Sequence, residues 1–205
     1  MHERVLERLN EAGLDVRPAE AGKLADYLLL LERWNRVHNL TGIREFDEMI
    51  ERHLAESLAL RGLLRGQRIA DVGSGAGLPG IPLAIVEPKK SFTLIESRAK
   101  RASFLSHVQG ALALSNVSVE HGRVEDLRGQ APFDTVLARA VAPLPELVGL
   151  TAHLLGEESV LLVPTKADVD VTTSGVDDRF EIRRIERDER ELLKGALIAI
   201  ERRVG

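Results

Sequence analysis

A glycine-rich segment constrains this chain more than any other feature. Residues 71–80 read Asp-Val-Gly-Ser-Gly-Ala-Gly-Leu-Pro-Gly. The run Arg68–Val72 predicts a buried strand, and residues 81–86 predict the helix that follows, because Pro79 and Pro82 are tolerated before or within a first helical turn. Glycine permits positive φ and lets a ligand approach main-chain N–H groups that a Cβ would cover. A strand, a glycine loop and a helix in this order predict a nucleotide-type ligand at the loop.

Two glycine patterns overlap in this segment. The G-x-G-x-x-G of dinucleotide-binding folds would run from Gly75 to Gly80, whereas the D/E-x-G-x-G-x-G of S-adenosylmethionine (SAM) methyltransferases would run from Asp71 to Gly77. The second pattern starts where the strand ends and includes Asp71, which the first leaves unexplained. Both require an acid about 20 residues further on, and Glu96 ends a second predicted strand, where it can accept both hydroxyls of a ribose. Loop, helix and acid together favour a cofactor site over an ordinary tight turn.

The composition indicates a soluble globular protein of one domain. A chain of 205 residues is long enough for one α/β domain with an extension and too short for two. No apolar run approaches the length of a membrane span, although hydrophobic residues make up 44% of the chain. The N-terminus alternates charged and apolar side chains instead of forming a signal sequence, so we expect a cytoplasmic protein.

The residue types present restrict the chemistry. The chain has no cysteine, which excludes disulfides, a thiolate nucleophile and cysteine-ligated metals. The six histidines have no close ligand spacing, so we expect no metal site. The net charge of −4 argues mildly against a nucleic-acid partner, but phosphate contacts depend on local cationic surface.

Residues 1–64 predict a helical extension, and residues 65–205 predict the core to which it is attached. The three apolar stripes of the extension are Val5, Leu6 and Leu9; Leu24, Leu28 and Leu31; and Ile50, Leu54 and Leu58. Their spacing is helical. Because these helices precede the first strand, we expect them to pack as a cap against the sheet, within one compact domain overall.

Strand and helix signals alternate in the core. Strands are predicted at residues 68–72, 92–95, 117–120, 133–137 and 160–163, and helices at 81–86, 99–113 and 144–155, which gives a parallel, doubly wound α/β sheet. Residues 180–185 and 197–200 predict an antiparallel pair instead, after a polar loop at 166–178. A mostly parallel seven-stranded sheet closed by an antiparallel terminal strand is typical of Rossmann-like SAM methyltransferases. The six-stranded dinucleotide fold lacks it, so the pattern that starts at Asp71 is favoured.

Ligands of such sheets bind beyond the carboxyl ends of the strands. The residues that follow strands two to five are Glu96 and Ser97; Arg123, Val124 and Glu125; Arg139; and Lys166. Val124 and Glu125 can form an adenine slot or an ordinary surface turn. Arg139 is a lone cation among small apolar residues, suited to a carboxylate or a phosphate, unless it is paired with Glu87 or Asp134. Lys166 is a weaker candidate for the same role.

The helix at 99–113 begins with cations. Arg98, Lys100 and Arg101 lie in its first turn, where the helix dipole favours anions, and this indicates an external anion. With Arg123 and the pair Lys89 and Lys90, these residues can form a basic face for RNA. A solvated helix surface explains them equally well.

Six motifs, in order along nearly the whole chain, resemble the bacterial 16S ribosomal RNA guanine-N7 methyltransferases, also called glucose-inhibited division protein B. The motifs are WNRVHNLT at 34–41, RHLAES at 52–57, DVGSGAGLPGIPL at 71–83, KRASFL at 100–105, RVE at 123–125 and RAVA at 139–142. Two positions depart from the family pattern, which usually has aspartate in place of Glu56 and a Lys-Gly pair in place of Lys166 and Ala167. The second departure puts in doubt any main-chain contact that needs glycine.

The resemblance implies a set of site residues. The SAM site would be lined by Gly73, Gly75, Gly77, Leu78, Glu96, Val124 and Glu125, with Arg139 at the end shared by cofactor and guanine, and with Asn35, Asn39 and His53 facing the cleft. From the residues alone, Asn39 and Thr41 can equally cap or end a helix, and His53 and Ser57 share one helical face. Gly80 is expected to serve helix packing.

The reaction implied by the resemblance needs little from the protein's own nucleophiles. Guanine N7 carries a lone pair and no proton, so the work is to hold N7 in line with the methyl group and to replace water around the moving charge. The substrate would be an unpaired guanine of small-subunit rRNA or of the assembling 30S particle, with Trp34 and Phe104 as stacking candidates, although a core role explains Trp34 as well. We expect a monomer. A small-molecule SAM methyltransferase, an NAD-dependent oxidoreductase and a non-enzymatic rRNA-binding assembly factor are the alternatives.

Overall fold

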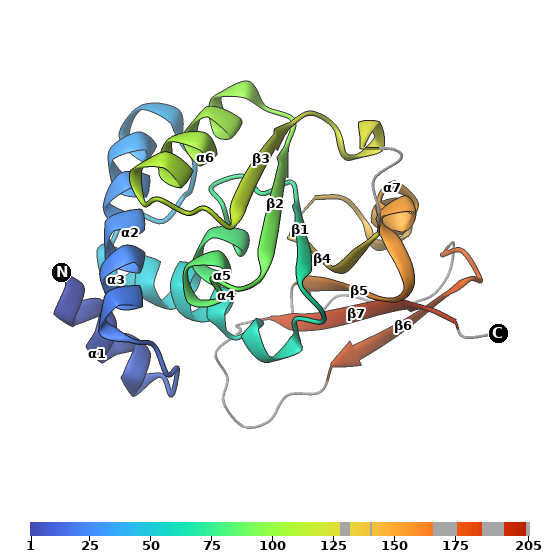
Figure 1. Cartoon of the computed structure of the whole chain (residues 1–205), viewed down its shortest axis with the longest axis horizontal. Coiled ribbons are helices and arrows are strands. Elements are labelled where there is room, and N and C mark those ends of the chain that lie inside the picture. The colour runs from blue at the N-terminus through green and yellow to red at the C-terminus, as the bar shows by residue number, and fades with distance from the viewer. Residues whose placement is uncertain (128–131, 140, 166–175, 186–194, 204–205) are drawn as a thin grey trace.

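The described residues form one seven-stranded sheet in the order β3-β2-β1-β4-β5-β7-β6 (Figure 1). The computed structural model describes residues 1–127, 132–139, 141–165, 176–185 and 195–203. The strands are β1 (Arg68–Val72), β2 (Ser91–Glu96), β3 (Val117–His121), β4 (Phe133–Ala138), β5 (Leu155–Thr165), β6 (Phe180–Ile185) and β7 (Ala196–Arg202).

Strands β1 to β5 pair in parallel, and β7 pairs antiparallel with both of its neighbours, β5 and β6. This confirms the predicted parallel sheet and the predicted antiparallel pair. The last strand does not lie at the sheet edge, however, because β7 is inserted between β5 and β6. The chain order reverses between β1 and β4, and ligands of open α/β sheets bind at such a switch point.

Helices cover both faces of the sheet (Figure 1). On one side lie α1 (His2–Glu11), α2 (Pro18–His38), α3 (Phe46–Met49), a π-helical segment η1 (Ile50–Ala55), α4 (Glu56–Leu58), the 3-10 turn η2 (Arg61–Leu63), α5 (Gly80–Val86) and α6 (Ala99–Ala111). The remaining helical elements of the described residues are the 3-10 turns η3 (Val124–Asp126) and η4 (Ala152–Leu154) and the helix α7 (Leu144–Thr151). No helix of the described residues is long and apolar enough to cross a membrane.

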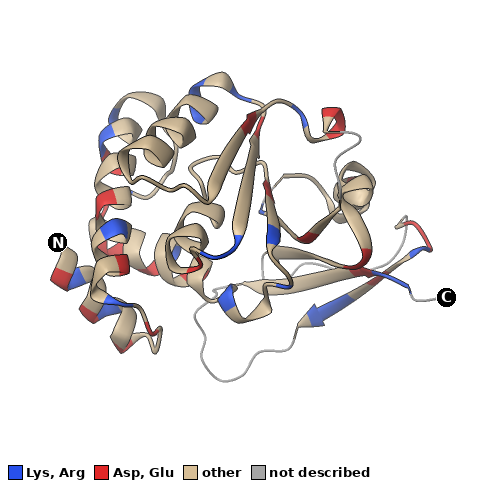
Figure 2. Cartoon of the chain, viewed as in Figure 1, with Lys and Arg blue, Asp and Glu red and all other residues tan. Residues whose placement is uncertain are grey.

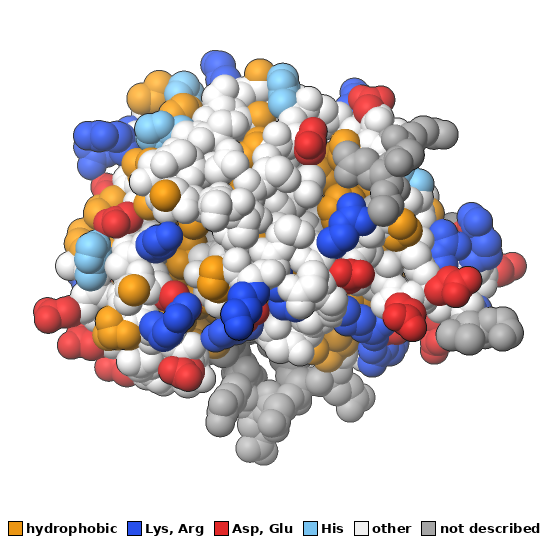
Figure 3. Space-filling model, viewed as in Figure 1, with side chains coloured by type: hydrophobic (Ala, Val, Ile, Leu, Met, Phe, Trp, Pro, Cys, Tyr) orange, Lys and Arg blue, Asp and Glu red, His pale blue; other side chains and the backbone are white. Residues whose placement is uncertain are grey.

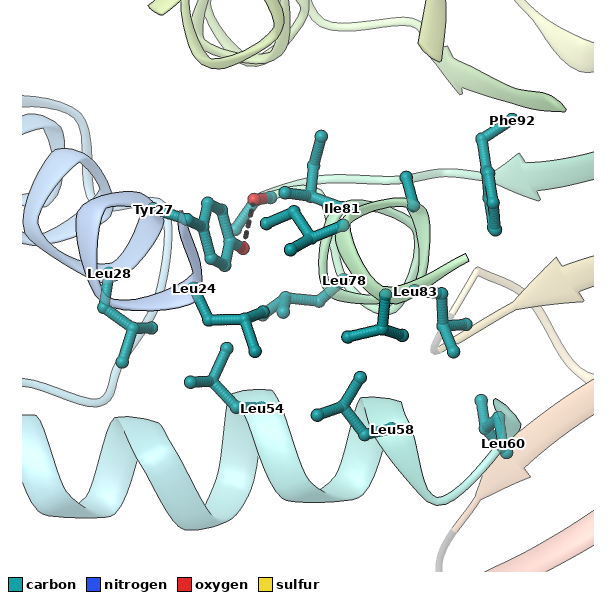
Figure 4. Close-up of a cluster of buried hydrophobic side chains, with 14 of the residues drawn as sticks. Leu24, Tyr27, Leu28, Leu54, Leu58, Leu60, Leu78, Ile81, Leu83 and Phe92 are labelled. Carbon is teal, nitrogen blue, oxygen red and sulfur yellow. Dashed lines mark hydrogen bonds between the residues drawn. The ribbon is translucent and has the colours of Figure 1, made fainter. Parts of the chain in front are cut away.

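The three predicted apolar stripes are buried, except for the partly buried Leu6. Their side chains join those of α5, α6 and the sheet in one hydrophobic cluster, and Figure 4 shows Leu24, Leu54 and Leu58 packed around Ile81 and Leu83 of α5. A second cluster lies on the other face of the sheet under α7. The helices of residues 1–64 therefore contribute to the core that supports the glycine loop.

Two predicted boundaries differ from the structure by four or more residues. The helix predicted at 144–155 ends at Thr151, whose hydroxyl donates to the Leu147 carbonyl, and a 3-10 turn follows. The strand predicted at 160–163 extends over residues 155–165, because Leu155 already pairs with Phe133 before an irregularity in the β4–β5 ladder. Exposed polar residues at 157 and 158 hide this start of β5 from an apolar-run criterion.

Candidate cofactor and substrate site

The glycine loop connects β1 to α5 at the switch point. Gly73, Gly75 and Gly77 all have positive φ, at 66°, 59° and 88°, a conformation that side chains with a Cβ rarely adopt. The Gly73 and Ser74 amides both donate to the Ile95 carbonyl, at 2.9 and 3.2 Å. The loop is therefore tied to the end of β2 and not only to its own strand.

The glycines of the loop have different surroundings. A Cβ on Gly77 would meet Ile81 Cγ1 at 2.6 Å, and one on Gly80 would meet Leu94 at 2.5 Å and Asp71 Oδ2 at 2.6 Å. A Cβ on Gly75 would meet nothing closer than 3.7 Å. Close packing therefore requires glycine at positions 77 and 80, which supports the packing role expected for Gly80, whereas Gly75 leaves open space beside its backbone.

Glu96 holds the loop from the end of β2. The residue is 3% exposed, its Oε2 accepts the Gly75 N–H at 2.9 Å, and its Oε1 accepts the Arg98 N–H at 2.8 Å. Each carboxylate oxygen has a further lone pair. The acid can therefore position the loop and still accept hydroxyls of a ligand.

Asp71 is a second buried acid, beneath the loop. Its Oδ2 accepts the Gly80 N–H at 3.0 Å, while Oδ1 has no hydrogen-bond partner among the described residues. Burial raises the pKa of Asp71 to about 7, against the opposing effects of the Gly80 N–H and the Arg139 charge.

Arg139 follows β4 and faces the N-terminal helices. Its Nη1 atom lies 3.9 Å from Glu56 Oε2, and Glu56 Oε1 accepts a hydrogen bond from Arg52 Nε at 2.6 Å. Glu56 thus lies between two arginines. The Arg139 guanidinium makes no hydrogen bond with other described residues, so its donors are available for an anion or a carbonyl.

The ion-pair partners predicted for Arg139 are wrong. Glu87 accepts a hydrogen bond from Arg61, and Asp134 Oδ2 accepts the N–H groups of Gln67 and Arg68 at 2.7 and 2.8 Å. Both acids lie at the opposite end of the strands from Arg139, which spacing along the chain does not reveal.

His53 and Asn35 meet through Thr41. The Thr41 hydroxyl is hydrogen-bonded to His53 Nε2 at 2.9 Å, and the Thr41 N–H donates to Asn35 Oδ1 at 2.9 Å. The buried Nδ1 atom of His53 has no hydrogen-bond partner among the described residues. Burial, with a smaller effect of the Arg139 charge, lowers the pKa of His53 to about 4, so the ring is neutral at physiological pH. Asn39 instead ends α2 with φ of 47° and is exposed.

Tyr27 joins α2 to the loop. Its hydroxyl donates to the Ala76 carbonyl at 2.8 Å, as the dashed line in Figure 4 shows, and burial raises the pKa of Tyr27. The charge of Arg139 favours the deprotonated forms of Tyr27, His53 and Asp71 alike, although these three groups come from α2, η1 and β1. Arg139 is therefore a cation whose field reaches all three of these polar groups.

Sequence reasoning misses three residues of this site. Tyr27 carries no motif signal, and Val141 lies against the loop, where its Cγ2 would be 2.8 Å from a Cβ on Gly73. Arg101 is expected from the sequence on an outer basic face, yet its Nη1 atom is the nearest side-chain atom to a Cβ built on Gly75, at 3.7 Å. The position of Arg101, five residues after Glu96 at the start of a helix, is the available signal.

The other predicted residues have different placements. Leu78 is 4% exposed and packs in the core (Figure 4), so only its backbone is available to a ligand at the loop. Ser97 and Arg123 are exposed. Val124 is buried in η3 beside the half-buried Glu125, and its carbonyl accepts a hydrogen bond from His153 Nε2 at 3.0 Å. Lys166 and Ala167 lie outside the described residues. Within the described part of the chain, no group of three His, Cys, Asp or Glu side chains is placed to hold a metal ion.

Comparisons with known proteins agree with this arrangement. Residues 20–173 match the family model described as rRNA small subunit methyltransferase G. The ribosomal RNA small subunit methyltransferase G of Shigella flexneri is 43% identical over 150 residues, which cover 73% of this chain and 72% of that protein.

Solved structures share the fold at low identity. The cofactor-bound Rv0187 from MTB has a TM-score of 0.62 with 18% identity, covering 90% of this chain and 91% of that one. A mutant of MtNAS in complex with S-adenosylmethionine has a TM-score of 0.53 with 16% identity, covering 98% of this chain and 72% of that one. The family match and the relative show that this chain belongs to the rRNA small subunit methyltransferase G family.

Proposed function

We propose that the protein transfers a methyl group from SAM to N7 of a guanine in the 16S RNA of the small ribosomal subunit. One observation carries the proposal: the open Gly75 backbone, Glu96 and Arg139 converge at the switch point of the sheet, inside the residues that match the methyltransferase G family. The name of the Shigella flexneri relative supports small-subunit ribosomal RNA as the substrate. The resemblance to the guanine-N7 methyltransferases supports N7 of guanine as the methylated atom.

The residues present fit SAM on three observations. The space beside Gly75 lets a ligand contact the main chain of the loop. Glu96 keeps lone pairs for ribose hydroxyls, and the buried Val124 offers an apolar wall for adenine beside Glu125. The bound SAM would supply an electrophilic methyl group on a sulfonium. We propose that Gly73 and Gly77 provide the positive-φ conformation of the loop, and that Leu78 and Ser97 make further contacts with SAM.

The protein's own residues would position and shield the reacting groups. Arg139 has free donors and would hold a carboxylate of the cofactor or a carbonyl oxygen of guanine. His53 is neutral and buried, and its unpartnered Nδ1 would contact the base, oriented by Thr41 and Asn35. We assign Asn39, Arg123 and Lys166 to the substrate side. No side chain has to take a proton, because N7 carries none.

The oxidoreductase alternative is disfavoured by the sheet. The dinucleotide fold has six parallel strands, whereas β7 here is antiparallel and lies between β5 and β6. Its G-x-G-x-x-G also assigns a cofactor role to Gly80, where a Cβ would meet Asp71 and Leu94 of the protein itself. We further propose that the protein acts as a monomer in the cytoplasm, without a metal.

Transfer of labelled methyl from SAM to small-subunit RNA from a strain lacking this methyltransferase tests the proposal. We expect incorporation at one guanine N7, loss of it in Arg139→Ala, and retention in Arg4→Ala, which removes an arginine paired with Asp47 far from the loop. Calorimetry should show SAM binding and no NAD binding. Absence of incorporation into any form of the RNA, or tight binding of NAD instead of SAM, would contradict the proposal.

A further inference from the structure

Three rings form a strip on the surface between α2 and α6. The ring centroid of Trp34 lies 5.2 Å from that of His38 on α2 and 5.5 Å from that of His107 on α6. The planes are inclined by 45° and 39°, so these rings do not close on one another as a parallel stack. We name Trp34, His38 and His107 the aromatic strip.

The strip has a buried side and an open side. Beneath it, Phe104 lies 5.5 Å from Trp34 and is fully buried, which removes Phe104 as a stacking candidate for a base. Trp34 and His38 are half-buried, and His107 is exposed. Figure 3 shows histidine, hydrophobic and basic side chains side by side over α6 and the adjoining part of α2, at the upper left.

Unpaired cations lie on the two helices that carry the strip. Most arginines of the described residues contact a carboxylate or a carbonyl oxygen, as Arg36 does with Glu32 at 2.9 Å. By contrast, Arg33 beside Trp34, and Lys100 and Arg101 on α6, have no hydrogen-bond or ion-pair partner among the described residues. Figure 2 shows basic positions on α2 and at the start of α6 on the same side of the molecule.

The strip leads to the cofactor site. Lys100 and His107 are seven residues apart and share one face of α6, roughly 10 Å along its axis. The Nη1 atom of Arg101, the residue after Lys100, lies 3.7 Å from the place that a Cβ on Gly75 would occupy. On α2, Trp34 precedes Asn35, which belongs to the Thr41–His53 contacts. Rings and cations therefore form a path from the outer surface to the glycine loop.

We propose that this path binds unpaired RNA next to the target guanine, with a base on the aromatic strip and phosphates on Arg33, Lys100 and Arg101. Flat rings interleaved with unpaired cations suit single-stranded RNA, because every base has a π face and every nucleotide a phosphate. An acidic protein would use the cations but would leave the exposed ring faces without a matching partner. The inference rests on the proposed function and extends it to the recognition of the substrate.

Trp34 is the only tryptophan of the chain, so its fluorescence reports on the strip directly. We expect an unmethylated single-stranded fragment of small-subunit RNA to quench this fluorescence, and a duplex of the same length to quench it far less. His107→Ala should weaken RNA binding about tenfold, as the loss of one stacked base does. Lys100→Gln should reduce the slope of log K against log salt by roughly 0.7.

Lys89→Gln is the matched control. Lys89 is also an unpaired exposed cation within the described residues, but it lies in the turn before β2, at the opposite end of the strands from the start of α6, so its predicted place on one basic face with Lys100 and Arg101 is wrong. We expect Lys89→Gln to bind RNA as the wild type does. Calorimetry should show unchanged SAM binding for His107→Ala, Lys100→Gln and Lys89→Gln.

If the wild type methylates RNA while His107→Ala and Lys100→Gln bind RNA and methylate it as Lys89→Gln does, the strip proposal is overturned and the proposed function stands. Quenching by an acidic protein but not by RNA overturns the strip proposal as well. If the wild type methylates no RNA, the proposed function itself fails.

Discussion

Asp71 is a buried carboxyl group beneath the glycine loop. It is 1% exposed, one of its oxygens has no partner among the described residues, and burial raises its pKa from 3.8 to about 7. A carboxyl group in such a place favours the protonated form in the folded protein. The free energy of unfolding should therefore depend on pH through Asp71.

Between about pH 4 and about pH 7 the unfolded chain ionises Asp71 and the folded chain does not, so the unfolded state binds fewer protons and the free energy of unfolding falls as pH rises. Asp71→Asn cannot ionise, and its amide oxygen can still accept the Gly80 N–H. We expect the free energy of unfolding of the variant, minus that of the wild type, to rise across this window by about 4 kcal/mol.

Urea titrations at several pH values measure this difference. His53, with its pKa lowered to about 4, acts in the opposite direction below pH 6.5, but it is present in both proteins and cancels. A difference that stays constant across the window would show that Asp71 is already ionised in the folded protein.

The glycines at positions 75 and 80 should respond differently to alanine. Gly80→Ala places a methyl group against Asp71 and Leu94 and should lower the free energy of unfolding by about 2–3 kcal/mol. Gly75→Ala meets no close atom, so the strained φ should cost only about 1 kcal/mol, but SAM binding should fall by on the order of tenfold. Denaturation of both variants measures the free energy of unfolding, and calorimetry measures SAM binding. Equal losses of stability would contradict a packing role for Gly80 and a ligand role for Gly75.

At the scale of elements, the π-helical segment η1 and α4 bring their polar side chains to the end of β4. Arg52 and His53 come from η1 and Glu56 from α4. Glu56 lies 3.9 Å from Arg139 and also binds Arg52, and the charge of Arg139 acts on His53. Glu56 separates two guanidinium groups that would otherwise repel each other. Its carboxylate therefore fixes where Arg139 can lie.

Glu56→Gln should lower kcat/KM for methyl transfer about tenfold, because Arg139 loses the carboxylate charge that lies 3.9 Å from its Nη1 atom and orients it. Glu56→Asp, which restores the usual residue of the family, should retain most of the activity. Steady-state kinetics with SAM as the varied substrate measure both. If Glu56→Gln and Glu56→Asp behave alike, Glu56 does not position Arg139.

Elements that depend on local spacing can be predicted from the sequence, and contacts between distant elements cannot. The strand Arg68–Val72 and the glycine positions are predictable because apolar runs and glycines act within a few residues. The bond from Tyr27 to Ala76 joins residues 49 apart, and the approach of Arg139 to Glu56 depends on how η1 docks on the sheet. Those contacts decide the electrostatics of the site, and no periodicity encodes them.

At the scale of the whole molecule, the helices of residues 1–64 and the sheet share one hydrophobic cluster. Leu24 of α2 and Leu54 of η1 belong to the same cluster as Ile81 of α5 and Phe92 of β2. A helical extension that buries its apolar side chains in the core of the sheet has no separate core to fold around. We therefore propose that the two predicted segments, 1–64 and 65–205, unfold together.

Thermal or urea unfolding followed by Trp34 fluorescence and by far-ultraviolet circular dichroism should give one transition with coincident midpoints. Leu54→Ala should lower the free energy of unfolding by about 2–4 kcal/mol and shift both signals equally. Two transitions, or a fluorescence midpoint that moves alone, would show that the helical extension unfolds separately.

The position of β7 bears on how the protein is made. A ribosome releases β6 before β7, yet the only hydrogen-bonded neighbour of β6 within the described sheet is β7, which also pairs with β5. During translation β6 therefore stays unpaired until β7 is made, and the sheet can be completed only after residues 196–202 have left the ribosome. A frameshift between β6 and β7 would thus remove two strands from the sheet, and would leave β5 as an exposed edge.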